Sequence, residues 1–201
     1  MKKLAIATLI LFGVTGTAIA AGNPSAGQAK AATCIACHGA DGNSMVPSFP
    51  KLAGQHADYT AKQLRDFKAG DRVDPSMAPM VAGLSEQDMD DLAAFYATQT
   101  PSIGAATDED KAARGRQIFL GGDASKGLSA CLACHGPNGA GIPGASFPML
   151  KGQHAAYTVK ALKDFRSGAR ANDNGSMMRS IAARMSDSDI EAVAEYIAGL
   201  H

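Results

Sequence analysis

The chain has 201 residues, and its 19 basic and 19 acidic side chains leave a formal net charge of zero. This balance excludes the basic excess that is typical of nucleic-acid binding. Aromatic residues make up only 5%, tryptophan is absent and there are 22 glycines, so side chains alone offer little for the core of a small domain. We therefore expect a large apolar cofactor to fill the interior of one domain or of two small ones.

The first segment is typical of an export signal. Two lysines at 2–3 precede an apolar run over 4–14, and residues 18–20 give the small-x-small pattern that a signal peptidase cleaves. An uncleaved membrane anchor is the alternative, but the run is shorter than the roughly 20 residues of a spanning helix. We expect a cleaved signal peptide over 1–20 and an exported, soluble mature chain that begins at Ala21.

The rest of the sequence contains an internal repeat. The offset between the copies grows from 97 to 98 to 101 residues, so we expect two small insertions in the second copy. A stretch rich in Thr, Ser, Ala, Pro and Gly separates the copies and indicates a linker. The segments that recur are Cys-x-x-Cys-His-Gly at 34–39 and 131–136, Phe-Pro at 49–50 and 147–148, Gly-Gln-His at 54–56 and 152–154, and Asp-Phe-x-x-Gly at 66–70 and 164–168. The predicted organisation is a domain over 21–100, a linker over 101–107 and a domain over 108–201.

Each copy predicts the same helices and no strand, so the fold class is all-α. The segments 56–68 and 154–166 have helical composition and end before Gly70 and Gly168, which are suited to C-caps. A Ser-x-x-Asp pair then opens the last helix of each copy, and apolar residues follow at helical spacing. The capping pairs are Ser85 with Asp88 and Ser186 with Asp189; the apolar faces are Met89, Leu92, Ala93 and Tyr96, and Ile190, Val193, Ala194 and Ile197.

The two Cys-x-x-Cys-His boxes predict covalent attachment of haem c. In each box two thiols add across the two vinyl groups of one haem, and the adjacent imidazole becomes the proximal iron ligand. The alternatives are a redox dithiol, a four-thiolate zinc site and a pair of disulfides, but none of them explains why a histidine follows both pairs. The expected attachment residues are Cys34, Cys37, Cys131 and Cys134, and the expected proximal ligands are His38 and His135.

A methionine is the usual sixth ligand in an electron carrier. Of the nine methionines, only Met77 and Met178 occupy one repeat position in both copies, each on a loop eight residues before the last helix. We predict them as the distal ligands, with Met80 and Met177 as the nearest alternatives.

Other repeated residues have less specific roles. Pro47 and Pro143 could each lend a carbonyl to the ligand imidazole, although an ordinary loop proline explains them equally well. His56 and His154 could replace methionine as iron ligands, but we favour polar residues at helix starts. The sequence contains no Ser-His-Asp set, phosphate loop or paired-carboxylate signature, so we do not expect an enzyme.

Together these features resemble the dihaem cytochrome c4 family. The resemblance rests on the duplicated haem boxes, on Phe-Pro-x-Leu-x-Gly-Gln at 49–55 and 147–153, on the helices that contain Tyr59 and Tyr157, and on the methionine loops. It implies two class I cytochrome c domains related by a pseudo-twofold axis, each with one covalent haem c and His/Met ligation. It also implies hydrogen-bonded haem propionates near the domain interface. The family's ligand positions fall on His38, Met77, His135 and Met178.

The same resemblance implies a one-electron carrier of the periplasm, monomeric and often loosely held at the membrane surface. Its donor would be the cytochrome bc1 region and its acceptor a terminal haem–copper oxidase. One alternative is the dihaem electron-accepting subunit of a dehydrogenase, such as a flavocytochrome sulfide dehydrogenase. Another is a dihaem peroxidase, which would need one iron without a stable sixth ligand.

The two copies also differ in charge. Residues 21–100 carry 6 basic and 9 acidic side chains, a net of −3, whereas residues 108–201 carry 11 basic and 10 acidic, a net of +1. We expect this asymmetry to orient the molecule so that each domain prefers a different redox partner.

Overall fold

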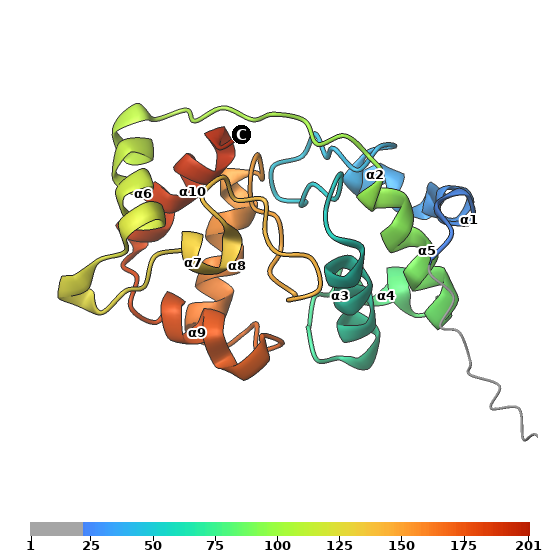
Figure 1. Cartoon of the computed structure of the whole chain (residues 1–201). Helices are drawn as coiled ribbons and strands as arrows, with labels where there is room; N and C mark the ends of the chain where they lie inside the picture. The colour runs from blue at the N-terminus through green and yellow to red at the C-terminus, as the bar shows by residue number, and fades with distance from the viewer. Residues whose placement is uncertain (1–21) are drawn as a thin grey trace, which may run out of the picture.

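The computed structural model describes residues 22–201, so the predicted signal peptide over 1–20 lies outside the described residues. Helices and two isolated bridges make up the regular structure of this part of the chain, which contains no strand and no helix long and apolar enough to cross a membrane. The all-α prediction is confirmed. Two helical units lie side by side, with the first running from blue to green and the second from yellow to red in Figure 1.

The two units repeat one order of helices. The first contains α1 (Pro24–Lys30), α2 (Ile35–His38), α3 (Ala57–Ala69), α4 (Ala78–Val81) and α5 (Glu86–Ala97). The second contains α6 (Glu109–Gly121), α7 (Leu132–His135), α8 (Ala155–Ser167), α9 (Met177–Ala182) and α10 (Asp187–Gly199). Short 3-10 turns occur at η1 (Ala31–Thr33), η2 (Ala124–Lys126) and η3 (Asn174–Ser176). An extended linker joins α5 to α6 along one side of both units (Figure 1).

Local sequence determines where the long helices begin and end. α3 and α8 stop at Gly70 and Gly168, whose positive φ angles of 84° and 80° give left-handed caps that other residues adopt only with strain. Both predicted capping boxes are present, at Ser85 of α5 and Ser186 of α10. The predicted apolar faces of α5 and α10 are buried, and they form the centre of each core.

The first and last helices of each unit cross at a glycine. A Cβ at Gly27 of α1 would lie 2.0 Å from the Asp91 carbonyl oxygen of α5, and one at Gly115 of α6 would lie 1.9 Å from the Ala192 carbonyl oxygen of α10. Only glycine allows the backbones to approach so closely.

The glycine crossings also reveal an insertion that the repeat analysis missed. Gly27 and Gly115 are 88 residues apart, whereas the Cys-x-x-Cys-His boxes are 97 apart, so the second copy holds nine extra residues between its first helix and its box. These residues accommodate η2 and an isolated bridge between Asp123 and Leu128. The prediction of only two insertions was therefore incomplete.

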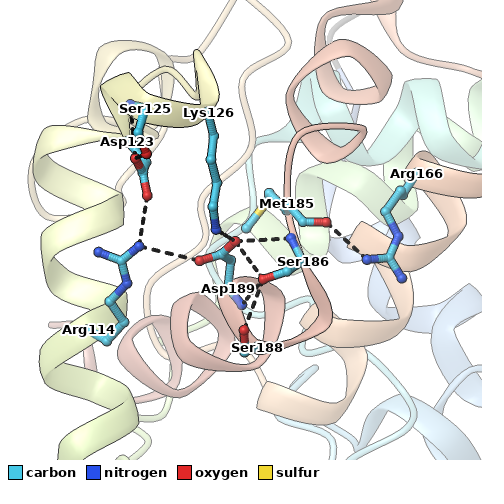
Figure 2. Close-up of polar contacts among 9 residues, drawn as sticks. All are labelled: Arg114, Asp123, Ser125, Lys126, Arg166, Met185, Ser186, Ser188 and Asp189. Atoms are coloured by element: carbon cyan, nitrogen blue, oxygen red, sulfur yellow. Dashed lines mark hydrogen bonds and ion pairs between the residues drawn. The ribbon is translucent and has the colours of Figure 1, made fainter.

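A buried carboxylate joins this inserted turn to α6 and α10 (Figure 2). Asp189, only 4% exposed, accepts hydrogen bonds from Ser186 in the capping box and forms ion pairs with Lys126 and Arg114. Arg114 also pairs with Asp123 at 2.9 Å. Burial alone would raise the pKa of Asp189, but the hydrogen bonds from Lys126 and Ser186 outweigh burial and hold that pKa well below its ordinary value.

We expect Asp189→Asn to lower the free energy of unfolding at pH 7 by about 1–2 kcal/mol, since charge-assisted hydrogen bonds are lost. The depressed pKa means that the unfolded chain binds more protons than the folded one at acid pH. The stability that Asp189 adds over asparagine at this position should be complete above pH 3.8, the pKa of the carboxyl in the unfolded chain, and should shrink as the pH falls below that value. The free energies of unfolding of the native protein and of Asp189→Asn should therefore become more similar at acid pH.

Denaturant unfolding of the holoprotein, followed by circular dichroism at pH 7 and near pH 3, measures both effects. Asp71→Asn is the matched control, because Asp71 is exposed and forms no ion pair among the described residues. A difference that stays constant across this pH range would contradict the assignment.

Candidate functional site

Each Cys-x-x-Cys-His box forms a single helical turn. Cys34 and Cys131 are the N-caps of α2 and α7, and each helix ends at its histidine. The backbone N–H of His38 donates to the Cys34 carbonyl at 2.9 Å, and that of His135 donates to the Cys131 carbonyl at 3.0 Å. This turn therefore holds the two cysteines and the histidine of each box close together in space.

The structure does not support the alternative uses of cysteine. All four cysteines of the described chain are free and half-buried, so residues 22–201 contain no disulfide. No cluster of three or more His, Cys, Asp or Glu side chains with metal-binding geometry occurs within that range, which argues against a shared zinc site. Burial raises the pKa of Cys131 to about 11, which disfavours the thiolate that a redox dithiol needs.

Both box histidines are buried and held in the neutral form. His38 and His135 are each only 6% exposed, and their Nδ1 atoms lie 2.9 Å from the carbonyl oxygens of Pro50 and Pro148. A carbonyl can only accept, so Nδ1 carries the proton and Nε2 keeps its lone pair. Burial lowers the pKa of both imidazoles, which keeps them neutral. These residues fit an iron ligand with a fixed ring orientation, in the same way in both units.

Of the two interpretations of Pro47 and Pro143, the structure excludes the carbonyl role, because the acceptors are Pro50 and Pro148. Pro50 and Pro148 share the 98-residue offset of the neighbouring repeats, whereas Pro47 and Pro143 are 96 apart and fall out of register. The repeated Phe-Pro dipeptide was therefore the signal for the correct pair. Its phenylalanine also lies beside the imidazole, with ring centroids 6.3 Å apart in the first unit and 6.4 Å in the second.

The two predicted distal methionines are more buried than the two methionines that were their nearest alternatives. Met77 is the N-cap of α4, Met178 lies in the first turn of α9, and both are half-buried. Met80 and Met177 are 46% and 41% exposed. Met178 packs against the core cluster of the second unit. The burial pattern thus favours the same pair as the repeat register.

His56 and His154 lie at helix starts, as predicted, since they are the N-caps of α3 and α8. Their side chains do not cap the helices but cross to the other unit. His56 Nε2 lies 2.8 Å from the Ala140 carbonyl oxygen, and His154 Nε2 lies 2.8 Å from the Ser44 carbonyl oxygen. Both imidazoles therefore belong to the interface between the units.

Two glutamines make the same exchange across this interface. The Gln55 side chain donates to the Met149 carbonyl and accepts from the Met149 N–H, each at 2.9 Å. The Gln153 side chain donates to the Lys51 carbonyl at 3.0 Å and accepts from the Lys51 N–H at 2.9 Å. Equivalent residues thus exchange equivalent contacts, as a pseudo-twofold axis between the units requires.

Two arginines also contribute to the interface, and neither was predicted from the sequence. Arg72 donates to the Tyr157 hydroxyl at 3.1 Å, and Arg170 donates to the Tyr59 hydroxyl at 2.9 Å. Each guanidinium also lies over a phenylalanine of its own unit, at 4.5 Å from the Phe67 ring and 4.4 Å from the Phe165 ring. A Gly-x-Arg motif recurs at 70–72 and 168–170, with the 98-residue offset of the neighbouring repeats, and this repeat could have identified both arginines.

Comparisons with known proteins agree with this geometry. A family model described as "Cytochrome c" matches residues 24–100 and again residues 112–201. The chain is 51% identical over 202 residues to cytochrome c4 of Pseudomonas aeruginosa, with 100% of both chains covered. It is 43% identical over 173 residues to the thiosulfate dehydrogenase electron acceptor of Stutzerimonas stutzeri, which covers 85% of this chain and 80% of that protein. The crystal structure of reduced recombinant cytochrome c4 from Pseudomonas stutzeri superposes with a TM-score of 0.88 at 50% identity, over 90% of this chain and 100% of that one.

Proposed function

The chain belongs to the dihaem cytochrome c4 family and carries two covalently bound haem c groups. We propose that it is a periplasmic electron carrier between the cytochrome bc1 region and a terminal haem–copper oxidase. The observation that supports electron transfer by haem is the pair of buried histidines whose Nδ1–H groups donate to Pro50 and Pro148. The export signal expected over 1–20 supports periplasmic residence.

We assign the ligands residue by residue. Cys34 and Cys37 hold the first haem through thioethers, with His38 and Met77 as axial ligands. Cys131 and Cys134 hold the second, with His135 and Met178. The domains extend over 21–100 and 108–201, and residues 101–107 form the linker. The linker is held at both ends, because Ser102 N–H donates to Asn43 and Thr107 N–H donates to Glu195.

Bound haem supplies an iron that accepts and releases one electron. The Pro50 and Pro148 carbonyls orient the imidazoles of His38 and His135, and burial of these two side chains restricts water around them. The thioethers of Met77 and Met178 would favour the reduced state of the bound haems. With a histidine and a methionine of this chain assigned to each haem, neither haem would have a ligand position left for a substrate, so we propose a carrier and not an enzyme. The paired glutamine and histidine contacts hold the two domains at a fixed distance and orientation.

Rapid-mixing kinetics test the proposed partners directly. We expect the oxidised protein to be reduced by quinol through a bc1 complex, and the reduced protein to be oxidised by a haem–copper oxidase, with rate constants of roughly 10⁵–10⁷ M⁻¹ s⁻¹ at moderate salt. Failure of both reactions with complexes from the same organism would overturn the proposed place in the respiratory chain.

A second candidate is the electron acceptor of a dehydrogenase. It is favoured by the likeness to the thiosulfate dehydrogenase electron acceptor of Stutzerimonas stutzeri over 85% of this chain. In that case, thiosulfate with its dehydrogenase should reduce the protein faster than a bc1 complex does. A stoichiometric flavoprotein on purification from the native source would instead indicate a flavocytochrome.

The unequal charges of the domains predict unequal salt effects on the two partners. We expect Asp71→Lys in the first domain to change the rate with one partner by roughly 2- to 5-fold at low salt and to leave the other nearly unchanged. Arg184→Glu in the second domain should do the reverse. Both side chains are exposed, and both lie outside the ion pairs of the described residues. Equal effects of each variant on both partners would contradict the orientation hypothesis.

A further inference from the structure

The two domains are not equivalent at the loop before the distal methionine. Arg72 and Arg170 are 98 residues apart, but Met77 and Met178 are 101 apart, so three extra residues fall in this loop of the second copy. The longer loop contains η3, where Gly175 and Ser176 take positive φ angles of 58° and 57°. It leads directly into α9 and Met178.

Asn172 in this loop reaches across to α3 of the first domain. Its side-chain Nδ2 donates to Gln63 Oε1 at 3.0 Å and to Asp66 Oδ2 at 2.5 Å. Its backbone carbonyl accepts from Lys62 Nζ at 3.0 Å. Within its own domain, Asn172 Oδ1 accepts from Arg170 Nε at 3.0 Å. Three of these four contacts therefore join the loop to the other domain.

The next residue carries the connection to the methionine helix. The Asp173 side chain, only 5% exposed, accepts from the Arg179 backbone N–H at 3.0 Å and from Arg179 Nε at 2.7 Å. Arg179 follows Met178 in α9. A continuous path of hydrogen bonds and backbone thus runs from α3 of the first domain, through Asn172 and Asp173, to the first turn of α9.

The first domain has no counterpart of this path. In the described part of the chain, the side chain of Asp74, three residues before Met77, accepts only from the N–H of Ser76, at 2.9 Å, and its carbonyl accepts from the N–H groups of Met77 and Ala78, so all its bonds stay within the first domain. Among the described residues, no hydrogen bond joins 73–81 to the second domain. One of the two acceptors is also missing, because Ala161 of α8 occupies the repeat position of Gln63, whereas Asp164 matches Asp66.

We propose that Asn172 is a positioning residue that ties the Met178 loop to α3 of the first domain, so that docking of the domains holds the distal ligand of the second haem but not that of the first. This proposal rests on the ligand assignment above. When the contact between domains loosens, the second iron should lose its methionine more readily, while the first should be unaffected. The two haems would then differ in how strongly their axial ligation depends on the interface.

Displacement of methionine by added imidazole tests this proposal. The readout is the weak absorption band in the red that reports the Fe–S(Met) bond. A Met77→His background removes the first domain's contribution, so that the remaining band belongs to the second haem. In this background we expect Asn172→Ala to speed the displacement by roughly 5- to 30-fold, the factor that corresponds to one or two lost hydrogen bonds.

Asn174→Ala is the matched control, because Asn174 lies in the same loop, is exposed, and makes no side-chain hydrogen bond in the described structure. Gln63→Ala removes one of the acceptors of Asn172 from the first domain. It introduces alanine, the residue that α8 has at the equivalent position. It should speed displacement of Met178. Because Gln63 Oε1 also accepts from Arg72 at 2.8 Å, in the first domain's own loop, Asn172→Ala is the variant for the reverse test: in a separate Met178→His background it should leave displacement of Met77 unchanged.

The proposal is overturned if Asn172→Ala matches Asn174→Ala, or if Asn172→Ala speeds displacement of both methionines equally. The starting spectrum keeps this result separate from the ligand assignment. A parent protein with two Fe–S(Met) bonds supports the assignment whatever the variants do, whereas a Met77→His protein without the band refutes Met178 as a ligand.

Discussion

A chain in which both Cys131 and Cys134 are replaced by serine is expected to carry one covalent haem instead of two. Serine cannot form a thioether with a haem vinyl group, and the box is the attachment point for the second haem. The protein core of that domain is built around Ile118, Phe119 and the buried face of α10, and it should lose much of its stability without the cofactor. The second domain should become protease-sensitive while the first keeps its haem.

Haem per chain, measured from the pyridine haemochrome spectrum and from the intact mass, provides the test. Cys34→Ser with Cys37→Ser is the matched variant and should also leave one haem, in the other domain. If the double variants do not accumulate, Cys131→Ser alone should retain one thioether and shift the α band of that haem to longer wavelength, because one vinyl group stays conjugated. Two haems in either double variant would contradict the assignment.

Gly115→Ala is expected to destabilise the second domain strongly. Its Cβ would lie 1.9 Å from the Ala192 carbonyl oxygen and 2.9 Å from the Tyr196 Cβ, and a backbone atom cannot move aside as the end of a flexible side chain can. α6 and α10 would have to separate along their whole crossing. We expect a loss of about 3 kcal/mol or more from the free energy of unfolding.

Denaturant unfolding of the holoprotein, followed by far-ultraviolet circular dichroism, measures this loss. Gly121→Ala is the matched control on the same helix, because a Cβ at Gly121 would have no neighbouring atom within 4 Å. It should change stability by less than about 1 kcal/mol, and in the stabilising direction if helix propensity dominates. Equal stability of the two variants would mean that the helix crossing is looser than described.

The features that sequence predicted well are local. The boxes, the glycine caps of α3 and α8, the capping boxes at Ser85 and Ser186 and the apolar face of α10 all depend on residues a few positions apart. Because each of these patterns occurs in both copies of the internal repeat, a chance match is an unsatisfactory explanation for them. The choice of Met77 and Met178 depends on the same register, and their burial favours it, but it stays a prediction.

The features that sequence missed depend on distant parts of the chain. The partner of His38 was sought at Pro47, nine residues away, whereas the carbonyl belongs to Pro50 at the end of a longer loop. His56 was interpreted as a helix-terminal polar residue, because its acceptor, Ala140, belongs to the other domain. Arg72 and Arg170 were not identified at all, since their roles depend on how two domains pack. A repeat shows which residues are equivalent, but not what they contact across an interface.

The central claim is that each domain holds a covalent haem c with histidine and methionine as axial ligands. The most direct test is the absorption spectrum of the purified protein, oxidised and reduced, combined with the pyridine haemochrome. We predict two c-type haems per chain, both low-spin, with the Fe–S(Met) band in the red at the strength of two bonds. A high-spin fraction, or a band of half that strength, would show that one iron is open or differently ligated and would contradict the account.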